Sequence, residues 1–133
     1  MSGDAASRDR TGILTPGFVR HDARGTFAEV LNDGSWESVI VAEMHPSAVL
    51  GHHYHKRTDV FLYLRSGRAT VTEVTVASGA LRRRALAAGE GVWLHAHVAH
   101  AIRFEEESSV LLLKSRRYDA ADPDTYEYSV PLA

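Results

Sequence analysis

The histidines carry the first chemical signal in this sequence. Six of the eight lie in two short clusters: His52, His53 and His55, and His95, His97 and His100. If residues 51–59 (GHHYHKRTD) are extended, His53 and His55 point to the same side of the strand, because side chains alternate along it. Two imidazoles about 7 Å apart along one strand face can converge on a single divalent ion.

A third imidazole is available from the second cluster. His100 opens a separate predicted strand after a loop, and it can approach His53 and His55 from across a barrel. Three histidines with an open coordination position are the pattern of catalytic zinc, and imidazole also suits other transition metals. We therefore expect one divalent metal ion, with zinc as the first choice and iron, nickel or manganese as alternatives. The competing interpretation is that these are surface or hydrogen-bonded histidines without a ligand role.

The composition limits the other chemistry. The chain has no cysteine, which excludes disulfides and thiolate metal ligands, so nitrogen and oxygen must hold any metal. With 15 basic and 17 acidic residues the formal charge is −2, unlike the basic chains that bind nucleic acid. No apolar run approaches the roughly 20 residues of a membrane helix, and residues 1–10 lack the apolar stretch of a signal peptide. We expect a soluble, cytoplasmic protein, with no nucleic-acid or membrane partner, whose residues 1–10 form a flexible tail.

The elements that position the histidines are short strands. Runs rich in Val, Leu, Ile, Thr and aromatic residues are separated by Gly, Ser, Pro and Asp. They predict strands at 26–31, 38–44, 59–65, 69–76, 80–86, 91–95, 100–104 and 109–114, with a last extended segment at 126–130. Strands at this spacing predict an all-β sandwich or small barrel, in a single domain over residues 1–133. Residues 116–133 form its C-terminal extension, which begins with a turn-rich segment.

Two motifs give a family resemblance. Residues 47–67 (SAVLGHHYHKRTDVFLYLRSG) resemble the first motif of the cupin superfamily, with His53 and His55 as its histidine pair. Residues 89–104 (GEGVWLHAHVAHAIRF) resemble the second motif, with His100 as its histidine. The resemblance implies the cupin fold, a small jelly-roll barrel built as a double-stranded β-helix, with a metal held by these histidines.

Departures from the cupin motifs bear on the chemistry. His95 stands where the family usually has proline, and His97 where it usually has glycine. The glutamate that serves many cupins as a fourth ligand is replaced by Val60, and the neighbouring acid, Asp59, is one residue out of register. A shift of one residue turns a side chain to the opposite face of a regular strand. We include Asp59 as a fourth metal ligand on the condition that a bulge or loop precedes it.

Two further stretches narrow the kind of cupin. Residues 24–31 (RGTFAEVL) and 116–130 (RRYDAADPDTYEYSV) resemble segments that flank the barrel in sugar-nucleotide cupins. These relatives are the dTDP-sugar epimerases and isomerases and the cupin (epimerase) domain of capsular-polysaccharide sugar-nucleotide reductases. The Gly-rich phosphate loop of the reductase domain is not found in this sequence. The resemblance implies a homodimeric isomerase acting next to a carbonyl group, on a keto-sugar nucleotide or an α-keto acid, in polysaccharide or secondary-metabolite biosynthesis.

Such chemistry needs a Lewis acid and a base. A divalent metal polarises the carbonyl oxygen, and a general base with a pKa near the working pH removes the proton. Histidine suits the second role because its ordinary pKa of about 6.5 lies near neutrality. His95 and His97 flank the barrel mouth in the motif alignment and are the catalytic candidates, the alternative for each being a solvent-exposed loop histidine. Two other functions stay open: a cupin-type metal-dependent oxygenase, and a non-catalytic ligand-binding cupin.

Overall fold

The computed structural model describes residues 10–132, so most of the predicted N-terminal tail lies outside the described residues. In chain order the strands are β1 (Phe18–Asp22), β2 (Gly25–Glu29), β3 (Ser38–Met44), β4 (Val49–Tyr54), β5 (Val60–Ser66), β6 (Arg68–Thr75), β7 (Leu81–Ala87), β8 (Glu90–Leu94), β9 (Val98–Phe104), β10 (Ser108–Lys114) and β11 (Tyr126–Glu127). No helix in this part of the chain is long and apolar enough to cross a membrane.

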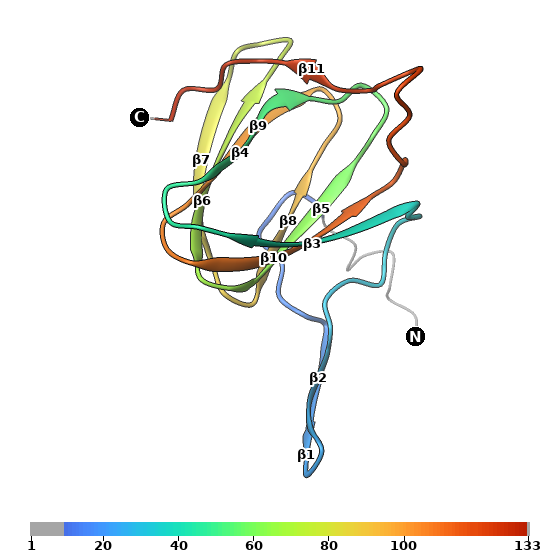
Figure 1. Cartoon of the computed structure of the whole chain (residues 1–133), viewed down its shortest axis with the longest axis vertical. Coiled ribbons are helices and arrows are strands. Elements are labelled where there is room, and N and C mark those ends of the chain that lie inside the picture. The colour runs from blue at the N-terminus through green and yellow to red at the C-terminus, as the bar shows by residue number, and fades with distance from the viewer. Residues whose placement is uncertain (1–9, 133) are drawn as a thin grey trace.

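Two antiparallel sheets face each other and form the barrel (Figure 1). One sheet has the strand order β3-β10-β5-β8, and the other has the order β11-β4-β9-β6-β7. From β3 to β11, strands that follow one another in the chain lie in opposite sheets, except for β6 and β7, which pair with each other. This is a jelly-roll arrangement, and the prediction of an all-β cupin barrel is confirmed.

Alternating side chains fill the space between the sheets. On β5, Val60, Leu62 and Leu64 are buried, and Ile102 and Phe104 of β9 meet them from the other sheet. These strands were expected from their apolar, β-branched composition, because such residues pack well on a pleated surface. The same core forms the floor of the cavity described below, since two of its members, Val60 and Ile102, also line that cavity.

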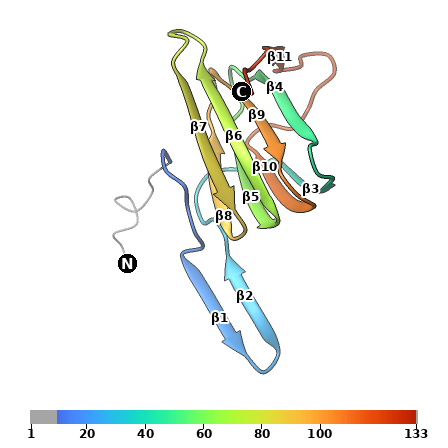
Figure 2. The same cartoon turned by 90° about the vertical axis from the view of Figure 1, so that its left-hand side faces the viewer.

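A two-stranded hairpin projects away from the barrel (Figures 1 and 2). The sequence predicted its second strand, but β1 was not predicted. The rings of Phe18 and Phe27 contact each other with centroids 6.2 Å apart. Even so they stay 49% and 55% exposed, because the barrel of the same chain does not cover them.

The C-terminal extension returns across the barrel. β11 pairs with β4 through Tyr126↔Tyr54 and Glu127↔His53, so it is shorter than the predicted segment 126–130. This strand carries the preceding residues, Asp124 and Thr125, to the end of β4. The extension is thus part of the wall around the histidines.

Candidate metal centre

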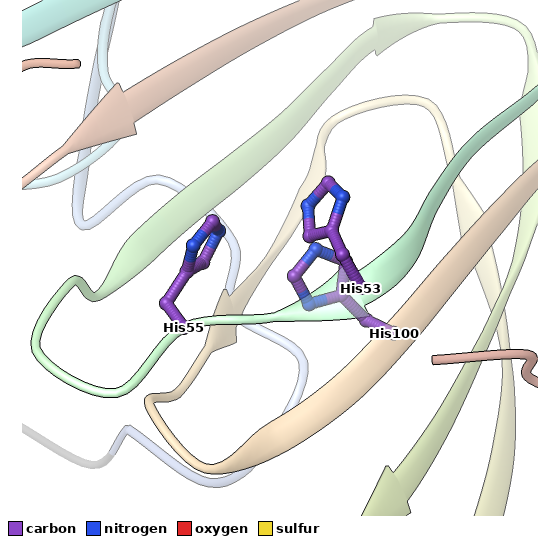
Figure 3. Close-up of side chains that lie close together, drawn as sticks. All are labelled: His53, His55 and His100. Carbon is purple, nitrogen blue, oxygen red and sulfur yellow. The ribbon is translucent and has the colours of Figure 1, made fainter. Parts of the chain in front are cut away.

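Three histidines meet inside the barrel (Figure 3). The ligand-capable nitrogens of His53, His55 and His100 all lie within 4.8 Å of one another. The closest pair of rings, His53 and His100, has centroids 4.8 Å apart. No other group of three or more potential metal-binding side chains is found in residues 10–132. The structure brings together the three histidines that the sequence predicted as ligands.

A bulge in β4 turns His53 toward His100. The two residues are register partners, and the pairing of β4 with β9 shifts between Gly51 and His53. Gly51 has φ 113° and His52 has φ 59°, both in the left-handed region. A Cβ atom at position 51 would collide with the carbonyl oxygen of His100. Glycine is therefore required where the two backbones approach most closely.

His55 follows β4 and is held by the C-terminal extension. Its Nδ1 lies 2.5 Å from the main-chain oxygen of Asp124. A carbonyl oxygen can only accept, so Nδ1 carries the proton and Nε2 keeps a lone pair for a ligand. The Asp124 carboxylate accepts hydrogen bonds from the backbone N–H groups of Lys56 (2.9 Å) and Arg57 (2.7 Å) and from the Thr58 hydroxyl (2.8 Å). Asp124 thus fixes both the ring and the loop that follows it.

Burial keeps two of the imidazoles neutral. The pKa of His53 falls to about 4, chiefly through desolvation and then through the neighbouring charges of His55 and Lys114. The pKa of His100 falls to about 3 for the same first reason, with His53 and His55 adding to it. The Nδ1 atom of His100 is buried without a hydrogen-bond partner among the described residues. At neutral pH these rings are neutral donors, which suits a metal ligand better than a base.

The histidines line a cavity of about 180 Å³. Half of its lining residues are aliphatic: Ile40, Leu50, Val60, Leu94, Ile102 and Leu112. Gly51, Lys114 and Thr125 complete it. Lys114 is half-buried, and its side chain also borders a shallow neighbouring groove that shares His55 and Thr125 with the cavity. An anionic group inside the cavity would therefore meet a cation near the histidines.

Asp59 does not join the histidine cluster. A loop does precede it, as the fourth-ligand prediction required, because β5 begins only at Val60. However, its carboxylate accepts a hydrogen bond from the backbone N–H of Ala96 at 3.0 Å. The loop turns this side chain toward the β8–β9 connection, and the group of potential ligands contains only histidines.

His95 and His97 are not among the residues that line the cavity. The ring of His95 stacks on Trp93, and its Nε2 lies 2.6 Å from the main-chain oxygen of Arg10. His97 is exposed and has φ 65°, and its backbone N–H donates to the carbonyl oxygen of His55 at 2.6 Å. The connection between β8 and β9 places both residues outside the cavity lining, so the structure does not bring these two catalytic candidates to the histidine cluster.

Sequence reasoning missed Lys114 and Asp124. Lys114 had a usable signal, because it shares strand parity with Leu112 and Val110 and must therefore face the interior with them. Asp124 had no local signal. Its hydrogen bonds reach residues 66 to 69 positions earlier in the chain, which only the folded chain brings near.

Residues 20–126 match the model of the polysaccharide biosynthesis C-terminal domain, which is most of the chain. The chain belongs to this family. The matched range contains β3 to β10 and all three histidines of the cluster. No curated protein sequence matches the chain.

Several solved structures have the same fold as this chain. CapF from Staphylococcus aureus, a capsular polysaccharide assembling protein, is 20% identical with a TM-score of 0.67, and the match covers 85% of this chain and 34% of that one. The chain thus spans about a third of CapF's length. ChmJ, a 3'-monoepimerase from Streptomyces bikiniensis solved with dTDP-quinovose, is 20% identical (TM-score 0.73; 91% and 70% covered). A 3,4-ketoisomerase from Helicobacter canadensis is 17% identical (TM-score 0.72; 86% and 87% covered). The resemblance to cupin epimerases is confirmed in the fold.

Proposed function

We propose that this protein is a metal-dependent epimerase or isomerase acting at a carbon next to a carbonyl group. The observation that carries the proposal is the convergence of three imidazoles in a small, largely apolar cavity. The fold is shared with a 3'-monoepimerase and a 3,4-ketoisomerase, which supports the reaction class. The proposal includes two substrate classes, keto-sugar nucleotides and α-keto acids, and places the reaction in a biosynthetic pathway.

The donor set fits a divalent ion. His53, His55 and His100 would hold it, with zinc as the first choice, since each offers one imidazole nitrogen and the chain has no thiolate. The fixed Nδ1–H of His55 is the hydrogen bond by which metal-binding histidines are usually oriented. A bound ion supplies Lewis-acid stabilisation of the negative charge that develops on the carbonyl oxygen.

The residues of the cavity wall provide the environment for the proton transfer. The aliphatic wall excludes bulk water and strengthens electrostatic interactions inside the cavity. A base takes the C–H proton, and the electron pair of that bond moves to the carbonyl oxygen as an enolate. Return of a proton to the other face of the same carbon completes the epimerisation, with no net redox change.

Deuterium exchange tests the proposal. The purified protein is analysed for metal and then incubated in D₂O with keto sugars and α-keto acids, with and without a chelator. We expect deuterium beside the carbonyl, lost with the chelator and in His53→Ala. The matched control is His45→Ala, which changes an exposed histidine paired with Glu107 outside the barrel cavity.

Other outcomes would contradict the proposal. O₂ consumption with bound iron would identify an oxygenase instead. Binding of a carbonyl compound without exchange would identify a ligand-binding cupin. Deuterium exchange that survives complete metal removal would refute the role of the metal, but the proposed isomerase activity would stand.

We also propose that the protein is a homodimer. The hairpin presents Phe18 and Phe27 to solvent, and Val39 and Val41 of the edge strand β3 are 63% and 73% exposed. Apolar side chains grouped in this way favour burial against a second copy. Light scattering on the full chain should give the dimer mass, and Phe27→Asp should shift it toward monomer. A monomeric wild-type protein would contradict this proposal.

A further inference from the structure

The wall of the histidine cavity limits what can bind there. Six aliphatic side chains form half of the lining. A sugar ring carries several hydroxyl groups, and each hydroxyl buried without a hydrogen-bond partner costs free energy. Outside the three histidines, Lys114 and Thr125 are the only side chains in the described wall that can hydrogen-bond. The cavity is therefore better matched to an apolar substituent than to a polyhydroxylated ring.

The size of the cavity also favours a small ligand over a sugar nucleotide. Its volume of about 180 Å³ is below the roughly 300–1,000 Å³ of pockets that enclose drug-sized ligands. The adjoining groove adds only about 10 Å³. A nucleotide diphosphate joined to a sugar would have to lie largely outside the enclosed space of this chain. A small molecule would fit within it.

Lys114 supplies the one full charge of the cavity. It is the only Lys, Arg, Asp or Glu among the described lining residues, and no ion pair of the described chain involves it. The other lysine of the chain, Lys56, lies outside the cavity with its Nζ 4.3 Å from the ring centre of Tyr126. A cation beside a carbonyl-binding site, with aliphatic walls around it, is complementary to a small carboxylate that also carries a ketone and an apolar group.

We infer that the cavity binds a 2-oxo acid with a branched or otherwise apolar side chain, with Lys114 pairing with its carboxylate. This rests on the proposed function and chooses between its two substrate classes. The keto oxygen faces the three histidines, and the apolar side chain packs on the aliphatic wall. The carbon that loses and regains its proton is carbon 3, next to the ketone.

Matched probes can test this inference. The acid probe is 3-methyl-2-oxopentanoate, and the neutral probe is 3-methylpentan-2-one, which replaces the carboxylate with a methyl group. The third is a dTDP-4-keto-6-deoxy sugar. Exchange at the carbon next to each ketone is followed by NMR in D₂O with the zinc-loaded full chain. We expect exchange of the acid with the lowest KM.

Lysine variants separate the charge from the fold. Lys114→Met should raise the KM of the acid by about 10- to 100-fold, as expected for a lost charged hydrogen bond. The KM of the neutral ketone should change by a much smaller factor, because this probe has no carboxylate to pair with Lys114. Lys114→Arg should restore most of the loss, and Lys56→Met should behave as wild type.

Each failure has a distinct meaning. Exchange of the nucleotide sugar without exchange of the acid overturns the inference and leaves the proposed function intact. No exchange with any of the three ketones overturns the proposed function and this inference with it. An unchanged KM for the acid in Lys114→Met overturns the role of Lys114.

Discussion

Replacing Asp124 with alanine should weaken metal binding although its side chain lies outside the ligand set. The carboxylate accepts three hydrogen bonds from residues 56–58, and the residue is 8% exposed. Burial alone would raise its pKa, but these hydrogen bonds outweigh burial and lower it. The side chain is therefore an ionised acceptor that holds the loop after His55.

The expected magnitude follows from these contacts. At about 1 kcal/mol for each hydrogen bond, Asp124→Ala should lose about 3 kcal/mol of unfolding free energy. Water can solvate the two freed backbone N–H groups in part, which limits the cost of leaving them unpaired. This is less than the roughly 5–15 kcal/mol of typical domain stability, so the variant should fold. The Asp124 carbonyl remains, but it is no longer anchored opposite the His55 ring. Metal affinity should then fall about 10- to 100-fold, as for other lost supports of metal-binding histidines.

Three measurements check this prediction. Urea unfolding of the metal-free protein gives the stability, competition with a chelator gives the Zn²⁺ affinity, and ¹⁵N NMR gives the proton position on His55. The matched control is Asp122→Ala, which removes an exposed ion pair with Arg57 on the same loop. Because exposed ion pairs contribute little to stability, Asp122→Ala should cost far less unfolding free energy than Asp124→Ala. It should leave the Zn²⁺ affinity and the proton position on His55 unchanged. Loss of stability with an unchanged Zn²⁺ affinity and an unchanged Nδ1–H signal would refute the reasoning.

Further predictions concern pH, the β4 bulge and the loop histidines. The folded pKa values of His53 (about 4) and His100 (about 3) lie below the ordinary 6.5, so the unfolded chain binds more protons below pH 6.5 and the metal-free protein loses stability as pH falls. Urea unfolding at pH 7 and pH 5 should differ by about 2 kcal/mol or less per histidine; equal stability would contradict the buried neutral rings. Gly51→Ala should cost at least about 1–3 kcal/mol in urea unfolding through backbone strain, with Gly79→Ala as the positive-φ control that meets no nearby atoms. His97→Ala should keep wild-type deuterium exchange within about twofold, since its contact with His55 is made by backbone; a loss above tenfold would restore it as a catalytic candidate.

The motif spacing was sufficient to predict the histidine cluster. His53 and His55 share a face of an extended chain because they are two positions apart, and His100 lies on the strand that pairs with β4. The strand pattern likewise predicted the barrel, because alternation of apolar residues is a local property. The hairpin strand β1 escaped prediction because its exposed mixture of Phe, Val, Arg and His has no one-sided pattern.

Side-chain direction in loops was decided by the tertiary structure. Asp59, His95 and His97 lie in connections where no strand parity applies, and each side chain follows a partner far away in the sequence or solvent. Asp124 supports His55 through contacts that no local pattern encodes. The sequence by itself determined which imidazoles could share one ion and that only nitrogen and oxygen could bind it. The folded chain alone decided which other groups surround that point, because their positions depend on long-range packing.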